Sequence, residues 1–234
     1  MNIIDLPTYI ITVEGENNKR KTRIKSNLNN IGFKNIKYIY GLKIDKKNKG
    51  FMQIQKEKSA EVALSHIEAL RNPGKMLIIE DDCLSTQDLL ISITDYPKNA
   101  DALYLGTSIY GMVNKISTPF GTRIKKINAK WDKPANMLGI HAILYLKEGY
   151  KRKTIKNLKH AIENKVFADE PIAEDMINNN IFSYEYPMFY QADEHNEYVT
   201  LSRLRDFLQY KDRNKIIAFS LWGDSPKYTI GAIK

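Results

Sequence analysis

The sequence is poor in cysteine and has no long apolar run. Cys83 is the only cysteine among the 234 residues, which excludes an internal disulfide and a thiolate-rich metal site. We expect Cys83 to be a small buried hydrophobic residue. No apolar segment approaches the ~20 residues that span a bilayer, and the first residues lack the basic start and cleavage site of a secretion signal. The sequence therefore predicts a cytoplasmic protein without a transmembrane segment.

The chain also has fewer acidic than basic residues, and it lacks the motifs of nucleic-acid binding. Lysine and arginine number 36 against 27 aspartates and glutamates, which gives a formal charge of +9. This charge suits an anionic partner. However, the lysines are dispersed, and no helix-turn-helix, zinc-finger or RNP-like pattern accompanies them. We therefore expect an anionic partner other than a nucleic acid.

Strand and helix patterns alternate along the chain, which predicts an α/β fold around a mostly parallel sheet. Apolar content of 43% is sufficient for one sizeable domain. The predicted strands are 8–13, 35–40, 75–80, 101–106 and 139–146. The predicted helices are 19–32, 59–72 with Ser59 as N-cap, 147–165, and one that begins at 172.

Other segments have weaker patterns. We expect a surface loop over 42–58, hairpins or loops over 107–138, and an irregular aromatic segment over 182–203. No linker precedes residue 212, so 1–212 is predicted to form one domain. Residues 213–234 have the pattern of a strand and a turn, and we expect them to begin a further domain of a longer protein.

Three consecutive carboxylates, Glu80, Asp81 and Asp82, follow the apolar run of 75–80. Ligands of open α/β sheets bind beyond the carboxyl ends of the strands. In an extended segment Glu80 and Asp82 would project to one side and Asp81 to the other. Two carboxylates on one side suit Mg²⁺ or Mn²⁺, whereas a solvated strand end is the alternative for a short acidic triplet.

The surrounding motifs resemble a known enzyme family. "SAEVALSHIEALRN" followed by "KMLIIEDDCL" is similar to the central signature of the family 25 glycosyltransferases, which include lipooligosaccharide and collagen galactosyltransferases. The first strand, the basic helix start, the later strands, and the "EPIAEDM" and "YPMFYQADEHNEY" segments resemble that family in the same order. The resemblance covers roughly residues 8 to 200.

The resemblance implies a GT-A-like, Rossmann-type sandwich and a metal-dependent, inverting glycosyl transfer. The donor would be a nucleotide-sugar such as UDP-galactose, UDP-glucose or UDP-N-acetylglucosamine, and the acceptor a hydroxyl of a glycan or a hydroxylysine. The implied cofactor is Mn²⁺ or Mg²⁺, with Glu80, Asp82 and His195 as ligands. The implied donor-binding residues are Thr12, Glu14, Arg20, Arg23, Ser65, His66 and Asp81.

An inverting transfer requires a carboxylate that deprotonates the acceptor hydroxyl. We predict Asp175, and next Glu174, for this role, because "PIAEDM" places these acids at an expected helix start that faces the acceptor segment. Acids at a helix start are also stabilised by the helix dipole alone. Tyr186, Tyr190 and Gln191 are candidates to line the sugar site.

Two other functions are compatible with the sequence. The segment "TVEGEN" lacks the Asn-Leu-Asp usual after the family's first strand, which is compatible with an inactive glycosyltransferase-like binding module. A metal-dependent nuclease or phosphotransferase would also use an acidic strand end. If the chain is a glycosyltransferase, two arrangements are open: Glu80 and Asp82 share the metal ion, or Asp82 binds it while its neighbours hold the ribose.

Overall fold

The computed structural model describes residues 1–12, 19–41, 49–85, 92–108, 110–118, 122–184 and 187–191. Its helices are α1 (Lys19–Ile31), α2 (Phe51–Leu70), α3 (Glu148–Asn164) and α4 (Glu170–Asp175), with short 3₁₀ turns η1 (Ile3–Asp5) and η2 (Met176–Asn178). No helix of these residues is both long and apolar enough to cross a membrane.

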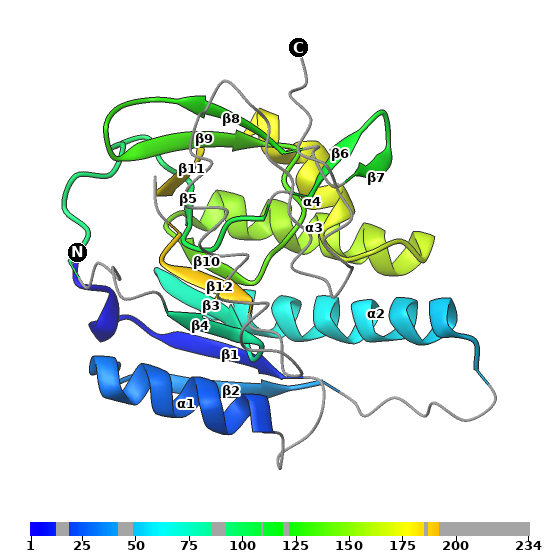
Figure 1. Ribbon diagram of the computed structural model, residues 1–234, viewed down its shortest axis with the longest axis horizontal. Helices are drawn as coiled ribbons and strands as arrows, with labels where there is room; N and C mark the ends of the chain where they lie inside the picture. The colour runs from blue at the N-terminus through cyan, green and yellow to red at the C-terminus, as the bar shows by residue number, and fades with distance from the viewer. Residues whose placement is uncertain are drawn as a thin grey trace, which may run out of the picture.

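A single large sheet forms the centre of the described structure (Figure 1). Its strand order is β2 (Ile36–Tyr40), β1 (Thr8–Thr12), β3 (Met76–Glu80), β10 (Ala142–Tyr145), β5 (Ala102–Tyr104), β11 (Ile181–Tyr184), β9 (Trp131–Ala135) and β8 (Arg123–Lys126). Among these eight described strands only β10 and β9 run against the other six. The prediction of an α/β fold with a mostly parallel sheet is confirmed.

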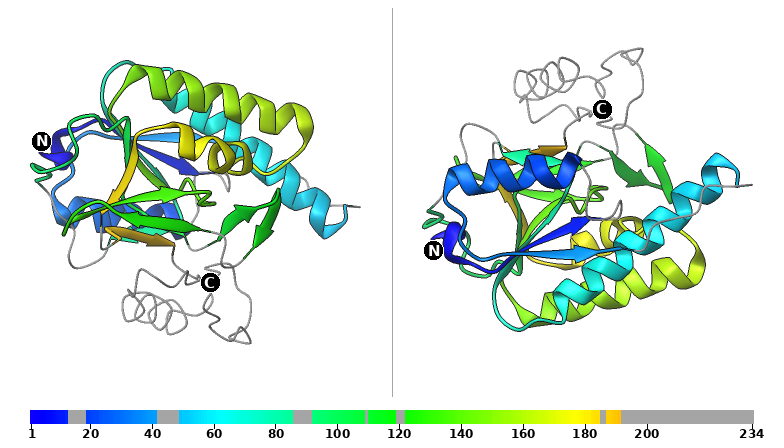
Figure 2. Two further views of the ribbon diagram at one scale, coloured as in Figure 1. Left: turned by 90° about the horizontal axis from the view of Figure 1, so that it is seen from above. Right: turned by 90° about the horizontal axis from the view of Figure 1, so that it is seen from below.

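Helices cover both faces of the sheet, as the two views of Figure 2 show. Alternate strand residues divide between two apolar cores. Ile78 packs with α2 and α3, whereas Leu77 and Ile79 pack with α1. This division is the reason that 75–80 reads as a continuous apolar run, because β3 is buried on both faces. The arrangement places both helical layers beside the carboxyl end of β3.

Two small sheets flank the large one. β4 (Cys83–Ser85) pairs with β12 (Phe189–Gln191), and β6 (Gly111–Val113) pairs with β7 (Ile116–Thr118). The β6–β7 and β8–β9 pairs confirm the predicted hairpins within 107–138. The irregular segment predicted over 182–203 is wrong in part, because β11 and β12 lie within it. Its short aromatic runs find strand partners far away in the sequence, which local patterns do not reveal.

The first helix confirms its prediction. Ile24 and Leu28 are buried on one side of α1, as their spacing indicates. Gly32 adopts a φ of +100° immediately after Ile31, a conformation that glycine tolerates and that ends a helix.

The second helix begins earlier than predicted. α2 starts at Phe51, so the loop predicted over 42–58 is wrong for its described final part, and Ser59 is not an N-cap. Instead the Ser59 hydroxyl accepts a hydrogen bond from the Ala168 amide at 2.7 Å. No proline or glycine follows Gly50 until the helix has ended, and glutamine, lysine and glutamate propagate a helix well. Residues 42–48 lie outside the described part of the chain.

Candidate active site

The candidate site lies at the edge of the sheet where β1 and β3 end. Asp81 donates its backbone N–H to the Ile11 carbonyl at 3.0 Å, which brings Thr12 and the acidic triplet together. Thr12 and Asp81 are both buried. The structure therefore unites one predicted donor residue of β1 with the predicted carboxylates of β3.

Glu80 is the last residue of β3 and faces α2. Its Oε1 lies 3.2 Å from Nε2 of His66, whose side chain is fully buried. Burial lowers the pKa of His66 to about 3, so the imidazole is neutral at pH 7, and the tautomer that carries its proton on Nε2 donates to the Glu80 carboxylate. Nδ1 of the same ring is buried without a hydrogen-bond partner in the described structure. His66 thus orients Glu80 without adding a positive charge. Ser65, its predicted companion, is also buried in α2.

The chain turns immediately after Glu80. Asp81 and Asp82 form this turn, and β4 starts at Cys83, so the extended alternation assumed for the three acids does not hold. Gln191 donates to Oδ2 of Asp82 at 3.3 Å. The buried Cys83 thiol lies 3.7 Å from Oδ1 of Asp82 and 3.3 Å from the His141 carbonyl. The prediction that Cys83 is a buried small residue is confirmed.

Burial and mutual repulsion oppose the charged forms of Glu80 and Asp82. Burial, followed by the negative charge of Asp81, raises the pKa of Glu80 to about 7. Burial, followed by the charge of Glu80, raises the pKa of Asp82 to about 7. Arg20 of α1 lowers both pKa values, but by less than these effects raise them. Arg20 therefore lies near the acids, as predicted, and the cluster still carries an excess of buried negative charge that favours a bound cation.

His141 is a residue that sequence reasoning missed. Its carbonyl accepts the Glu80 N–H at 2.8 Å. Its ring is buried, and neither ring nitrogen has a hydrogen-bond partner in the described structure. The ring occupies the space beside Gly106, where a Cβ would lie 2.2 Å from Nε2. The His141 carbonyl thus holds the end of β3 just before the turn. The His141 ring fills the space that a larger side chain at position 106 would need.

Asp169 is a second residue that was missed. It directly precedes α4, and burial raises the pKa of its carboxyl to about 7. The negative charge of Glu80 also raises this pKa, so the two carboxylates lie near each other. The sequence "DEP" carries the signal that could have found Asp169, because proline in the first turn marks a helix start.

The predicted bases Asp175 and Glu174 lie at the opposite end of α4 from Asp169. The predicted helix start is wrong, because α4 ends at Asp175. The Asp175 carboxylate accepts hydrogen bonds from three asparagines, Asn157, Asn178 and Asn179, at 3.1 to 3.3 Å. Burial raises the pKa of Asp175, but these bonds together lower it below its usual value. Glu174 is exposed. The structure does not join either acid to the carboxylate turn.

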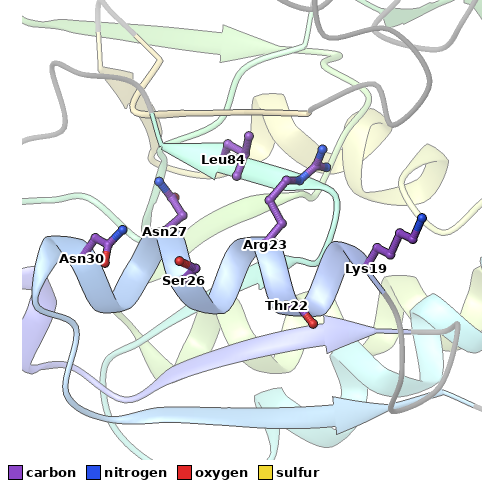
Figure 3. A pocket seen from close by; sticks show the side chains of 7 residues that line it. All are labelled: Lys19, Thr22, Arg23, Ser26, Asn27, Asn30 and Leu84. Carbon is purple, nitrogen blue, oxygen red and sulfur yellow. The ribbon is translucent and has the colours of Figure 1, made fainter.

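Arg23 lines a different space from Arg20. A cavity of about 600 Å³ lies along α1 and is lined by six side chains of that helix, from Lys19 to Asn30, together with Leu84 of β4 (Figure 3). Glu14, His195 and Tyr186 lie outside the described residues, so their roles stay predictions. Tyr190 pairs with Leu84 across β12 and β4.

Glu80 and Asp82 fit a divalent cation in their chemistry, because both are hard oxygen ligands with uncompensated charge. Among the described residues no group of three or more histidines, cysteines, aspartates or glutamates is arranged to hold a metal ion. A cation here would therefore need oxygen ligands from water, from a phosphate or from the rest of the chain.

Comparison with known proteins identifies no family. No family model matches the chain, and no curated protein matches it. Several solved structures are similar in fold, among them three at 8% to 11% identity. A glycosyltransferase involved in glycosylation of the major capsid of PBCV-1 has 8% identity and a TM-score of 0.38, and covers 86% of this chain and 99% of its own.

Two further similar structures are a cytidylyltransferase and a pyrophosphorylase by their descriptions. CTP:phosphocholine cytidylyltransferase from Streptococcus pneumoniae has 11% identity and a TM-score of 0.46, over 87% of this chain and 99% of its own. A nucleoside-diphosphate-sugar pyrophosphorylase from Vibrio cholerae RC9 has 10% identity and a TM-score of 0.38, over 77% and 73%. Similarity at this level carries no argument about activity.

Proposed function

We propose that this chain is a metal-dependent glycosyltransferase that moves a sugar from a UDP-sugar to a hydroxyl acceptor. One observation carries the proposal. Glu80 and Asp82 crowd two carboxylates of raised pKa at the carboxyl end of a doubly buried strand, with Arg20 beside them. Such a site has an affinity for a cation and, through the cation and the arginine, for a diphosphate.

Glu80 and Asp82 would hold the Mn²⁺ or Mg²⁺ ion. When bound, the ion neutralises the charge that develops on the departing nucleoside diphosphate. The chain's own residues prepare this step. His66 fixes the orientation of Glu80 through its Nε2–H, Gln191 fixes Asp82, and Arg20 provides a positive charge for the diphosphate.

Asp169 is our candidate for the base that deprotonates the acceptor hydroxyl. The residue is partly exposed, its carboxyl lies near Glu80, and its pKa is raised to about 7, which suits a general base at neutral pH. Asp175 was predicted for this role from the sequence. Its hydrogen bonds to three asparagines and its lowered pKa both weaken it as a base.

The test is a calorimetric titration of UDP and UDP-sugars into the full chain, with and without Mn²⁺. We expect UDP binding that depends on Mn²⁺ and that falls at least 100-fold in Asp82→Asn, because the variant loses one of two charged ligands. Asp95→Asn is the matched control. Asp95 is an exposed acid paired with Lys130, so this variant removes the same charge at a distance from the turn.

Each alternative function has its own outcome. Binding of UDP-sugar without its hydrolysis, in the absence of acceptor and with acceptor mixtures, would identify an inactive binding module. Cleavage of DNA or RNA with Mn²⁺ in the absence of UDP binding would identify a nuclease. UDP binding that is equal in the wild type and in Asp82→Asn would contradict the proposed site.

A further inference from the structure

The groove along α1 is open and is lined mainly by residues with polar side chains, and the transfer chemistry does not use it. Six side chains from Lys19 to Asn30 line it at the three- and four-residue spacing of a single helix face, opposite Leu84 (Figure 3). These positions span twelve residues, and the eleven steps between the first and the last make roughly 16 Å of helix at 1.5 Å per residue. A volume of about 600 Å³ is typical of a site for a small molecule. The groove is therefore long enough for more than one sugar ring.

Arg23 provides the groove with a positive charge, and two of its guanidinium nitrogens have no partner among the described residues. Its Nε and Nη2 atoms are buried and have no hydrogen-bond partner in the described part of the chain. These two N–H groups lie on the same edge of the guanidinium, and this edge binds a carboxylate or phosphate through two parallel hydrogen bonds. A buried donor pair without an acceptor costs free energy. Since neither atom is exposed, the guanidinium would have to turn toward the groove before this two-donor fork could pair with an oxyanion.

This fork is separate from the carboxylate turn. The charges that shift the pKa values of Glu80 and Asp82 include Arg20 but not Arg23. Although the two arginines are close in sequence, Arg20 acts on the acidic turn and Arg23 lines the groove. The groove adjoins the candidate active site through α1 and through β4, which follows Asp82 directly.

The rest of the lining suits sugars better than a nucleotide base. Ser26, Asn27 and Asn30 present hydroxyl and amide groups, which donate to and accept from sugar hydroxyls. Asn27 is held in place by two bonds of 3.0 Å to Ser85, one to its hydroxyl and one from its N–H. Leu84 is the only apolar side chain among the lining residues, and none of them is aromatic. A base would find no ring on which to stack.

We propose that the α1 groove binds an acidic oligosaccharide, with its carboxylate or phosphate on Arg23 and its hydroxyls on Ser26 and Asn30. If the proposed function holds, this oligosaccharide is the acceptor. The acceptor then enters along α1, with Lys19 nearest to the amino-terminal end of the helix, where Arg20 adjoins the carboxylate turn. Acidity of the acceptor becomes a determinant of specificity that is independent of the metal.

The test is a titration of the full chain with a trisaccharide of galacturonic acid, in the absence of UDP and of metal. Neutral trigalactose, a phosphate-substituted galactose trisaccharide and inorganic phosphate are the comparison probes. We expect the uronate or the phosphate-bearing trisaccharide to bind at least tenfold more tightly than trigalactose and inorganic phosphate. Arg23→Gln should remove this preference, because it deletes the charged fork, which contributes about tenfold or more in affinity.

Lys25→Gln is the matched control, since it removes one positive charge from an exposed position of α1 outside the groove. It should leave the preference unchanged. Equal affinity for acidic and neutral trisaccharides would overturn the proposal, as would tight binding of inorganic phosphate alone. Weaker UDP binding in Arg23→Gln, with trisaccharide binding unchanged, would mean that Arg23 binds the donor. That result would also overturn the proposal. Failure of UDP to bind at all contradicts only the proposed transfer.

Discussion

The acidic turn after β3 and the acidic end of α4 contain the same kind of side chain in opposite environments. Burial and mutual repulsion raise the pKa values of Glu80 and Asp82 to about 7. At the end of α4, three asparagine amides surround the Asp175 carboxylate and keep its pKa low. In the first region burial and repulsion outweigh the nearby charge of Arg20, whereas in the second the hydrogen bonds outweigh the effect of burial.

This difference separates a binding site from a structural contact. A carboxylate that the protein already satisfies stabilises the fold and has little reason to bind a ligand. A carboxylate whose charge remains uncompensated at a strand end reduces stability unless something binds it, which is typical of functional sites. On this basis Asp169, whose pKa is also raised to about 7, belongs with the turn even though it directly precedes the helix that ends at Asp175.

The largest expected effect tests this assignment of Asp169. Asp169→Asn should lower the rate of sugar transfer by at least about 100-fold, because a general base contributes 10² to 10⁴ in rate. Asparagine has the size and shape of aspartate, and the Asp169 side chain makes no capping hydrogen bond to α4, so α4 should keep its structure. The measurement is the turnover of UDP-sugar with acceptor at saturating donor, together with the affinity for UDP, which should change little.

Asp175→Asn is the paired variant for that experiment. Its transfer rate, corrected for the folded fraction, should fall less than that of Asp169→Asn. The opposite order would restore the assignment that the sequence predicted and would contradict the role of Asp169.

The next effect concerns the support of the turn. Gly106→Ala should reduce the free energy of unfolding by about 3 kcal/mol, because the new Cβ would overlap the buried His141 ring and force it to move. Gly149→Ala is the matched control, since no atom lies within 4 Å of its Cβ position and alanine is preferred over glycine in a helix. The measurement is chemical denaturation of each variant.

The double variant Gly106→Ala, His141→Ala identifies the cause of that loss. Its unfolding free energy should exceed the value expected by adding the two single effects, because removing the ring removes the clash. Simple additivity would show that the ring of His141 is not what excludes a Cβ at position 106.

Much of the first half of the molecule was predictable from the sequence. The spacing of Ile24 and Leu28 and the glycine at 32 define α1, and the continuous apolar run 75–80 defines a strand buried on both faces. The same run places the acidic turn at the edge of the sheet where ligands bind. These features depend on local periodicity and on one general rule of α/β sheets.

The residues that were missed depend on strand direction and on partners distant in sequence. β10 runs antiparallel to β3, so its first residues, and not its last, reach the ligand edge. A rule based on the carboxyl ends of strands therefore passes over His141. Likewise Asp175 has the same local pattern as a catalytic acid, and only Asn157 and Asn179, brought to it by folding, reveal its structural role.

The smallest expected effect is a pH dependence of stability that originates at Asp175. Its folded pKa lies below its value in the unfolded chain, about 3.9. Its contribution to stability is therefore complete well above pH 4 and is lost as the pH falls through the folded pKa.

We expect Asp175→Asn to reduce the unfolding free energy by about 1 kcal/mol at pH 7, and the difference from the wild type to narrow below pH 4. Denaturation series between pH 7 and pH 3 measure this, with the exposed Glu174→Gln as control. A difference that stays constant across the series would show that the asparagines do not favour the charged form of Asp175, and the contrast between the two acidic regions would then rest on geometry alone.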